Sequence, residues 1–324
     1  MKGAVLNSQP GALEIEELVI DDPGPGEVLL RTVGAGLCHS DLHFMEGTFR
    51  SKLPALLGHE SAGVVEAVGE GVDYCKPGDH VIACLSMFCG VCRQCLSGNP
   101  HRCSNPAATT RPKGAKPRIS KPDGTPVDPF ARLGGFAEMM LVHQNAVVTI
   151  TKDMPLDRAA LIGCGITTGM GAVFRTAKVE PGSRVCVIGA GGIGLAAIQA
   201  ARIAGAGQVI VVDMSDEKLQ TAQLMGGTDL VNAATTDDVV AAVKELSGGG
   251  VDYSFEAIGL KATAEQAFNM LDLGGTATVI GMVPSNQKLE IRGIDLLSEK
   301  RLQGSMMGSN RFRMDMPAMV NMYL

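Results

Sequence analysis

The stretch VCVIGAGGIGLAAIQAARIAGAGQVIVVD, residues 185–213, decides the fold of the second half of the chain. A β-branched run leads into Gly189-Ala190-Gly191-Gly192-Ile193-Gly194, which matches the pattern G-x-G-x-x-G and opens a helix-like run of small residues. In this pattern the first glycine permits a tight turn, the second lets backbone N–H groups approach a pyrophosphate, and the third allows close helix–sheet packing. Asp213 ends the next strand, at about the 20-residue distance where a carboxylate binds ribose hydroxyls. The stretch therefore predicts a βαβ unit that binds a dinucleotide.

The same residues predict NAD rather than NADP. The Asp213 carboxylate would repel a 2′-phosphate, and Met214 beside it offers no cation to bind one. Gly192 and Ile193 belong to the turn and helix start whose backbone N–H groups would face the pyrophosphate. Lys218, one helical turn beyond the strand, is either a further ribose contact or a solvated helix lysine. A glycine turn without a ligand is the alternative interpretation.

Strand-like and helix-like runs alternate through the second half of the chain, which predicts βαβ units in a parallel sheet and an α/β fold class. The expected strands are 184–190, 208–213, 229–232, 251–259 and 276–282. The expected helices are 194–204, 215–225, 236–247 and 262–273. The first half has short runs closed by glycine turns, which predict a β-rich domain; examples are 26–36, 61–72 and 78–85.

We expect domains at 1–152 and 153–305, with a long surface loop at about 104–134. The uncharged run Val185–Ala201 is short for a membrane span, and its glycines divide it into a strand and a helix. We therefore predict no membrane association.

Composition narrows the class of protein further. The chain has 324 residues, of which 45% are hydrophobic and 19% are charged, as in a globular protein. The 28 Lys and Arg against 34 Asp and Glu leave a net charge of −6, which excludes a general nucleic-acid binder. No long apolar run follows Met1-Lys2, and the nine cysteines are an odd number. These features predict a cytoplasmic protein whose thiols are reduced and serve in metal binding or catalysis.

Four cysteines are closely spaced in the pattern C-x₂-C-x₂-C-x₇-C, within a lobe at about 86–104. They are Cys89, Cys92, Cys95 and Cys103. Four thiolates at such spacing suit a closed tetrahedral zinc site that orders its loop. An iron–sulfur cluster is the chemical alternative.

Cys38, His59 and Cys164 form a second candidate set. Two thiolates and one imidazole with an open fourth position make a known catalytic zinc site. The three residues are far apart in the chain, so their spacing does not show that they meet. A buried apolar cysteine and a structural histidine are the alternatives.

The order of these motifs is informative. Gly36-Leu37-Cys38-His39-Ser40-Asp41-Leu42-His43 is followed by Gly58-His59-Glu60, the four-cysteine lobe, Gly163-Cys164-Gly165 and the glycine-rich turn. Over nearly the whole chain this resembles the zinc-dependent alcohol dehydrogenases of the medium-chain dehydrogenase/reductase superfamily. The resemblance implies a GroES-like catalytic domain, then a Rossmann-type domain, with the active site in the cleft between them.

The resemblance also implies roles for the residues near the metal. Cys38, His59 and Cys164 would bind a catalytic zinc, in addition to the structural zinc of the lobe. Asp41 would orient the ligand histidine, since a zinc-bound imidazole needs a partner that fixes its tautomer. Glu60 would approach the metal during ligand exchange.

Further roles follow for proton transfer and for the cofactor. Ser40 would bond the substrate oxygen, and His43 would end the proton relay. His39 would contact the cofactor pyrophosphate, and Thr168 would pack beside the nicotinamide. The implied reaction moves a hydride between a primary or secondary alcohol and NAD, and reduces an aldehyde or ketone in reverse.

The substrate is less determined. Phe49, Leu85 and Met140 are expected to line an apolar pocket that favours medium-chain or aromatic alcohols, with ordinary core packing as the alternative. A locally basic loop suggests a second candidate, an anionic substrate such as S-(hydroxymethyl)glutathione, unless the loop is simply solvated. Its cations are Arg111, Lys113, Lys116, Arg118 and Lys121. A non-catalytic protein that senses NAD and zinc is a third hypothesis.

Two expectations concern assembly and extent. Residues 298–306 could form an edge strand that pairs with its copy, so we expect a homodimer, with a homotetramer as the alternative. The chain ends at Met319–Leu324 in a helix-like run. Family members typically continue for tens of residues, so the resemblance implies that residues 306–324 begin a return segment to the catalytic domain and that the rest of this segment is missing.

Overall fold

The computed structural model describes residues 1–324, which form two compact units. Unit 1 comprises Met1–Gly165 together with Arg311–Leu324, and unit 2 comprises Ile166–Asn310. The first division falls after Gly165 rather than at the expected 152, because helix α3 (Leu156–Leu161) packs against the strands of unit 1. The second falls after Asn310 rather than at 305, because the turn Met307–Ser309 packs on helix α4 (Thr167–Gly171) of unit 2.

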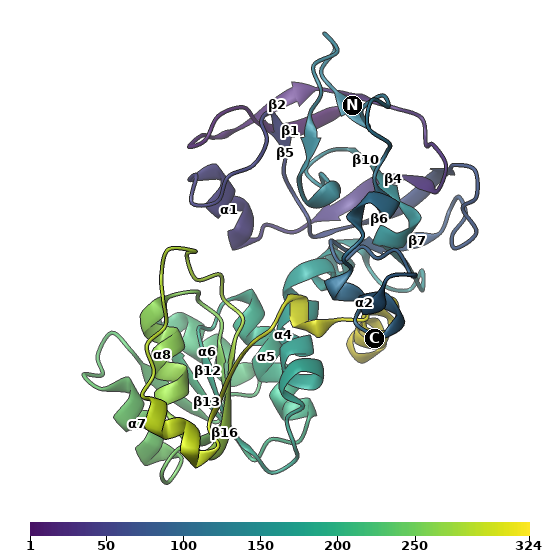
Figure 1. The fold of residues 1–324 in the computed structure, drawn as a ribbon. Coiled ribbons are helices and arrows are strands. Elements are labelled where there is room, and N and C mark those ends of the chain that lie inside the picture. The colour runs from purple at the N-terminus through teal and green to yellow at the C-terminus, as the bar shows by residue number, and fades with distance from the viewer. The chain divides into compact units, whose positions relative to one another are not determined.

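Unit 1 is built on antiparallel strands, as its valine-rich runs predict (Figure 1). Its larger sheet has the order β10-β4-β6-β7-β11 and encloses an apolar core that includes Val28, Leu30 and Val65. These strands are β4 (Glu27–Ala35), β6 (Ser61–Val68), β7 (His80–Ala83), β10 (Met139–His143) and β11 (Val147–Ile150).

A smaller sheet of unit 1 has the order β2-β1-β5-β9, and a two-stranded pair joins β3 to β8. The strands are β1 (Lys2–Leu6), β2 (Leu13–Glu17), β3 (Val19–Ile20), β5 (Ala55–Leu56), β8 (Ile119–Ser120) and β9 (Asp128–Pro129). The expected loop 104–134 thus contributes two short strands. The helices of unit 1 besides α3 are α1 (His39–Met45), α2 (Arg93–Leu96) and α9 (Phe312–Tyr323).

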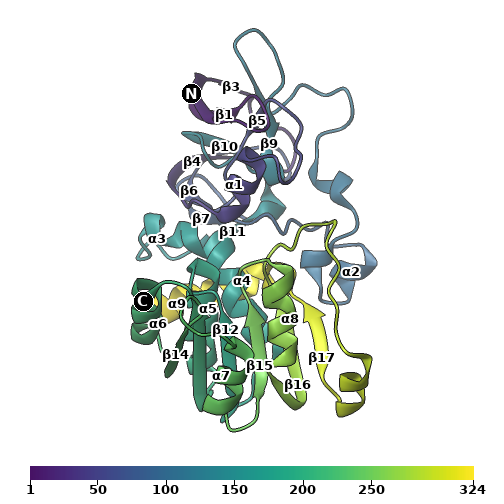
Figure 2. The same ribbon diagram turned by 90° about the vertical axis from the view of Figure 1, so that its left-hand side faces the viewer.

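Unit 2 is a parallel six-stranded sheet in the order β14-β13-β12-β15-β16-β17 (Figure 2). Counted along the chain this is the order 3-2-1-4-5-6 of a doubly wound dinucleotide-binding fold. The strands are β12 (Arg184–Ile188), β13 (Gln208–Asp213), β14 (Asp229–Asn232), β15 (Val251–Glu256), β16 (Leu271–Val279) and β17 (Arg301–Gly304). The α/β fold class predicted from the alternation is confirmed.

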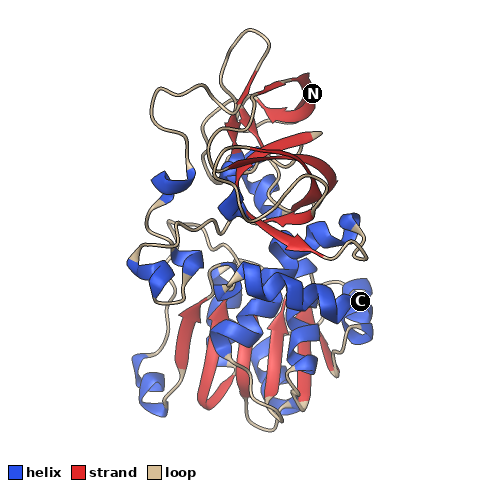
Figure 3. Cartoon of the chain, turned by 90° about the vertical axis from the view of Figure 1, so that its right-hand side faces the viewer, coloured by secondary structure: helices blue, strands red, loops and turns tan.

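Helices pack against the faces of this sheet (Figure 3). One face is covered by α7 and α8, whose Val239, Val243 and Phe268 share a core with Ile188 and Ile210 of the sheet. The helices are α5 (Gly192–Ile203), α6 (Asp216–Leu224), α7 (Val239–Leu246) and α8 (Lys261–Asn269). The helix expected at 262–273 ends at Asn269, because strand β16 already begins at Leu271.

The uncharged run Val185–Ala201 is divided between β12 and α5, as its glycines predict. None of the helices combines the length and apolar character that crossing a membrane requires.

Candidate functional site

Cys38 is the N-cap residue of helix α1, and its extended backbone conformation marks the point after β4 where the helix begins. The Asp41 carboxylate reaches back and accepts a hydrogen bond of 3.2 Å from the Cys38 backbone N–H. This arrangement satisfies one of the N–H groups that a helix start leaves unpaired. It also fixes where the Cys38 thiol lies.

Asp41 binds the His59 segment as well, through its other oxygen. Oδ1 lies 3.2 Å from the Gly58 backbone nitrogen and 3.2 Å from His59 Nδ1. His59 and Asp41 are 2% and 3% exposed, so this contact is shielded from water. A carboxylate at Nδ1 holds the proton there and leaves Nε2 as the free ligand atom. The predicted orienting role of Asp41 therefore has the required geometry.

Cys164 lies in a π-helical turn, Ile162–Ile166, where it is buried. The ligand atoms of Cys38, His59 and Cys164 lie within 4.8 Å of one another. The fold thus brings together three residues that sequence spacing alone could not connect. Two thiols, one imidazole and no fourth protein ligand fit an open, catalytic type of zinc site.

The electrostatics of this cluster favour a thiolate at Cys38 and a neutral thiol at Cys164, because the hydrogen bond with Cys38 and burial both raise the pKa of Cys164. A hydrogen bond from Cys164 and contact with His59 lower the pKa of Cys38 far below that of an ordinary thiol. Burial disfavours charge on His59, but hydrogen bonds with Asp41 and Cys38 outweigh it and raise the pKa of His59 to about 10. The lowered pKa of Cys38 favours its thiolate, the form in which a cysteine binds a metal.

Glu60 lies next to this cluster and is 5% exposed. Its Oε1 accepts a hydrogen bond of 2.7 Å from the Gly165 backbone N–H, and burial raises the pKa of Glu60 to about 7. A side chain at Gly36 would collide with this carboxylate. Sequence reasoning gave no role to Gly36 or Gly165; the available signal was a glycine beside a candidate ligand.

The predicted proton-relay residues lie on α1. Ser40 Oγ is 3.6 Å from Cys38 Sγ, so this hydroxyl stands beside a ligand atom. His43 is one turn further along, with its ring edge-on to Phe49 at a centroid distance of 5.6 Å and to His39 at 4.7 Å. His43 Nδ1 is buried and has no hydrogen-bond partner in the structure. The exposed side chain of His39 extends from the same helix.

The four-cysteine lobe has the geometry of a closed metal site. Its Sγ atoms are separated by 3.9 Å (Cys89–Cys95), 3.5 Å (Cys92–Cys95) and 3.9 Å (Cys92–Cys103). A tetrahedron with Zn–S bonds of about 2.3 Å has edges of about 3.8 Å. Backbone N–H groups of Cys89 and Cys92 point at Cys103 Sγ and Cys89 Sγ, both at 3.3 Å, and so support thiolate charge. The four residues therefore fit a zinc ion with no open position.

The glycine-rich turn of unit 2 leaves space for a ligand. Gly189 has φ +96°, and a Cβ at Gly194 would collide with the Gly189 carbonyl, so the fold itself requires both glycines. Gly191 has an ordinary φ of −80°, and a Cβ on Gly191 or on Gly192 would meet nothing within 4 Å. Neither backbone strain nor packing explains glycine at these two positions. An approaching ligand explains both, because backbone N–H groups at the start of α5 bind phosphate.

Asp213 stands at the carboxyl end of β13, beside this turn. Its carboxylate accepts hydrogen bonds from the backbone N–H groups of Ala190 (2.8 Å) and Ser215 (3.0 Å). It therefore holds the turn in place. Lys218 lies one turn into α6, and Ile193 is the second residue of α5. Thr168, also in unit 2, is buried and its hydroxyl donates to Met307 Sδ at 3.4 Å.

The residues expected to line the substrate pocket differ in their surroundings. Met140 is 1% exposed and packs in the core of the larger sheet, with Leu85 partly buried against the same core, which favours the alternative of ordinary core packing for these two residues. Phe49 differs, because it lies against His43.

The basic loop is not a free anion-binding surface. Arg111 and Arg118 form ion pairs with Glu27 at 2.6 Å and 2.7 Å, and Lys116 and Lys121 pair with Asp21 and Glu16. Four of the five cations are thus neutralised within unit 1, because acidic residues of the first strands face this loop. Only Lys113 has no ion-pair partner.

Known protein families and proteins are similar to this chain over most of its length. A family model for the alcohol dehydrogenase GroES-like domain matches residues 24–152, and one for zinc-binding dehydrogenases matches residues 192–323. Alcohol dehydrogenase class-3 of Zea mays is 37% identical over 330 residues, which cover 100% of this chain and 86% of that protein.

Solved structures agree. An alcohol dehydrogenase zinc-binding domain protein from Burkholderia ambifaria is 35% identical, with a TM-score of 0.94 over 99% of this chain and 88% of that one. Benzyl alcohol dehydrogenase from Acinetobacter calcoaceticus is 34% identical, with a TM-score of 0.90 and the same coverage. The chain therefore belongs to the zinc-binding alcohol dehydrogenases of the medium-chain dehydrogenase/reductase superfamily, and it is an alcohol oxidoreductase.

Proposed function

We propose that this oxidoreductase transfers a hydride between a primary or secondary alcohol and NAD, with one catalytic and one structural zinc per chain. The observation that carries the proposal is the convergence of Cys38, His59 and Cys164 within 4.8 Å, with Asp41 behind the histidine. A protein that only sensed NAD and zinc would need no open metal site in addition to the closed one.

Cys38, His59 and Cys164 would hold the catalytic zinc, and Cys89, Cys92, Cys95 and Cys103 the structural one. A zinc ion at the open site supplies Lewis acidity, which lowers the pKa of an alcohol hydroxyl. Asp41 keeps the His59 ring in its ligand orientation. Glu60, held by the Gly165 N–H, remains close enough to exchange with an incoming oxygen ligand.

The proton of the alcohol is proposed to leave through Ser40 and His43. The Ser40 hydroxyl lies beside the Cys38 sulfur, where a substrate oxygen would sit, and can pass on a proton in either direction. His43 is one helical turn away and carries an unpartnered Nδ1. Imidazole is the side chain best suited to exchanging protons at neutral pH, so His43 is the proposed outlet of the relay.

NAD, when bound, accepts the hydride. The open turn at Gly191 and Gly192 would face its pyrophosphate, with His39 as a further contact, and Asp213 with Lys218 would bind the adenosine ribose. Thr168 would pack beside the nicotinamide. The position of Asp213 supports NAD over NADP, because a carboxylate disfavours an added phosphate.

The proposed substrates are medium-chain or aromatic alcohols. The similarity to benzyl alcohol dehydrogenase supports this, as does the aromatic side chain of Phe49 next to His43. An anionic glutathione adduct is less supported, because the ion pairs of the basic loop leave only Lys113 to recognise it. A homodimer through the exposed edge strand β17 completes the proposal.

The test is turnover by purified, zinc-loaded protein with a panel that includes benzyl alcohol, hexanol and S-(hydroxymethyl)glutathione, each with NAD and with NADP. We expect benzyl alcohol with NAD to give the highest kcat/KM, and Cys38→Ala to abolish turnover while NAD binding persists. Turnover that survives Cys38→Ala, or a preference for NADP, would contradict the proposal.

A further inference from the structure

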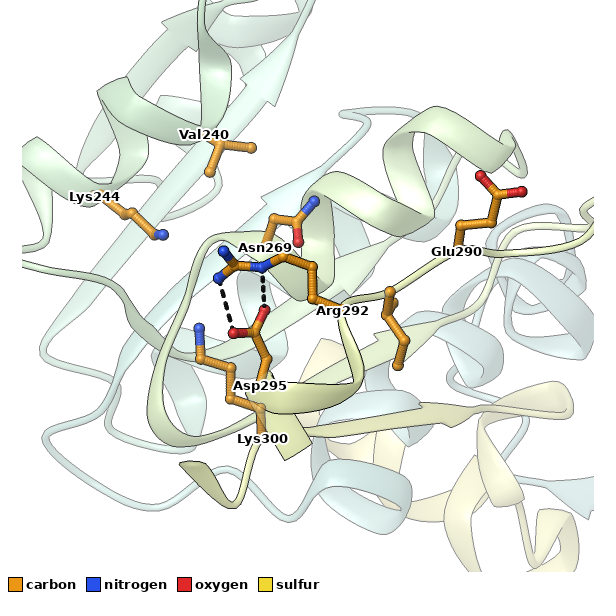
Figure 4. Close-up of a pocket in the computed structure, with 8 residues that line it drawn as sticks. Val240, Lys244, Asn269, Glu290, Arg292, Asp295 and Lys300 are labelled. Atoms are coloured by element: carbon orange, nitrogen blue, oxygen red, sulfur yellow. Dashed lines mark hydrogen bonds and ion pairs between the residues drawn. The ribbon is translucent and has the colours of Figure 1, made fainter. Parts of the chain in front are cut away.

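A pocket lined by charged side chains lies in unit 2, outside the residues assigned above. It has a volume of about 500 Å³, within the range of small-molecule sites. Its walls come from α7 (Lys244), the end of α8 (Asn269), and the segment before β17 (Glu290, Arg292, Asp295 and Lys300). Figure 4 shows the Lys244 and Lys300 side chains extending toward the Arg292 guanidinium from either side.

The charges in this pocket do not balance. Arg292 is bound in a two-point contact by Asp295, at 3.1 Å and 2.8 Å. Glu290, the other acidic wall residue, pairs with Lys261 at 3.3 Å and points away from the three cations in Figure 4. Neither Lys244 nor Lys300 forms an ion pair with any carboxylate of the structure. Three cations therefore share a single inward-facing carboxylate.

Such an arrangement leaves positive charge uncompensated in the pocket. The Arg292 side chain is 77% exposed and Lys244 and Lys300 are half-buried, so water only partly screens the repulsion among them. Burial and repulsion from Lys244 lower the pKa of Lys300, and this agrees with the geometry. A bound anion would relieve the repulsion, and the lysines are free to provide it with charge-assisted hydrogen bonds.

Within unit 2, the pocket and the glycine-rich turn lie at opposite ends of the strands. In a βαβ unit each helix runs antiparallel to its strands, so the carboxyl ends of the helices lie near the amino ends of the strands. Lys244 is in the last turn of α7, Asn269 ends α8, and Lys300 directly precedes β17. The pocket therefore lies at the amino ends of the strands, whereas the turn that follows β12 lies at their carboxyl ends. An anion bound here would not be the pyrophosphate of the dinucleotide.

We propose that Lys244, Arg292 and Lys300 form a binding site for a phosphate group of a small molecule. Arg292, oriented by Asp295, supplies the planar donor group, and the two lysines supply point charges on either side. The volume exceeds what one phosphate fills, and Asn269 offers an amide beside the cations, so a phosphate ester with hydroxyl groups fits better than inorganic phosphate. The site does not depend on the proposed NAD chemistry.

Isothermal titration calorimetry tests the site, with inorganic phosphate, inorganic pyrophosphate and glycerol phosphate as separate probes. We expect saturable binding with Kd near or below about 1 mM for at least one probe. The double substitution Lys244→Gln/Lys300→Gln should weaken it at least tenfold, because two of the three cations are removed. Tighter binding of glycerol phosphate than of inorganic phosphate would identify an ester as the ligand class.

Matched variants separate this site from other phosphate sites. Lys178→Gln removes one exposed cation of unit 2 outside the pocket and should leave the Kd unchanged, and Lys300→Arg should retain binding because it keeps the charge. Thermal melting of every variant checks that the fold is intact. Absence of saturable binding by the wild-type chain, or equal Kd values for wild type and the double variant, would overturn the proposal.

Discussion

Asp41→Asn is a sharp perturbation of the candidate active site, because one carboxylate joins both of its ligand segments. Oδ2 accepts the Cys38 N–H, while Oδ1 accepts both the Gly58 N–H and His59 Nδ1–H. An asparagine has a single acceptor oxygen. It can keep the pair at Gly58 and His59 only by turning its NH₂ group against the Cys38 N–H.

The magnitude follows from that mismatch. One buried N–H left without an acceptor costs about 1–3 kcal/mol, which corresponds to about 5- to 150-fold in an equilibrium constant. Loss of the negative charge also makes His59 a weaker ligand. Removing such a partner typically weakens a metal site by about 10- to 100-fold, which agrees with the first figure. We expect a loss of zinc affinity in this range at the Cys38 site alone.

Competition with a zinc chelator measures this, with zinc content followed as the chelator concentration rises. The Asp41→Asn protein should lose one zinc at a 10- to 100-fold lower chelator activity, while the second zinc is released as in wild type. Asp22→Asn, an exposed carboxylate of unit 1, is the control and should leave both affinities unchanged. Unchanged release of both zinc ions from Asp41→Asn would refute the reasoning.

Three further predictions follow from individual contacts. Gly191→Ala should weaken NAD binding at least tenfold while changing the free energy of unfolding by about 1 kcal/mol or less, since its Cβ meets no protein atom. Gly194→Ala should instead destabilise the fold itself, because its Cβ would collide with the Gly189 carbonyl. Calorimetry measures NAD binding and thermal melting measures stability, so the two effects can be separated. His43→Gln should lower kcat by about 10²-fold without changing zinc content or alcohol KM, and added imidazole should partly restore kcat. If His43 served only in packing, steady-state kinetics would show no such loss of kcat and no rescue by imidazole. Burial alone would raise the pKa of Glu27, but hydrogen bonds from Arg111 and Arg118 outweigh it and lower that pKa below its usual 4.5. Its stabilisation is therefore complete at neutral pH and lost as the pH falls below about 4.5, so Glu27→Gln should cost about 3 kcal/mol at pH 7 and progressively less in acid; a pH-independent difference in denaturant melts would count against this.

The local patterns of unit 2 predicted its fold well. Strands β13 and β14 have the predicted bounds, and Ser215 caps α6 as its sequence indicates, because periodicity and capping are local properties. The predicted end of α8 was wrong by several residues, since Leu271–Leu273 continue the helical pattern but belong to strand β16, where Leu271 pairs with Val251 of β15. Tertiary pairing outweighed local preference there.

Of the two candidate metal sites, one could be predicted from local spacing and the other could not. The four-cysteine lobe is evident from spacing, because its ligands are contributed by one short loop. Cys38, His59 and Cys164 could be connected only through resemblance, since the contacts that bring them together span the whole of unit 1. The ion pairs of the basic loop could not be predicted for a related reason: the acidic partner of Arg111 and Arg118 lies 84 and 91 residues earlier in the chain.

The central claim is that this chain binds two zinc ions, one at an open site and one at a closed site. Elemental analysis of zinc per chain, on wild type, Cys38→Ser and Cys95→Ser proteins purified in parallel, tests it most directly. We expect about two zinc ions in wild type and about one in each variant. Cys38→Ser should abolish turnover while it leaves the zinc of the four-cysteine lobe in place. One zinc in wild type, or two retained by Cys38→Ser, would contradict it.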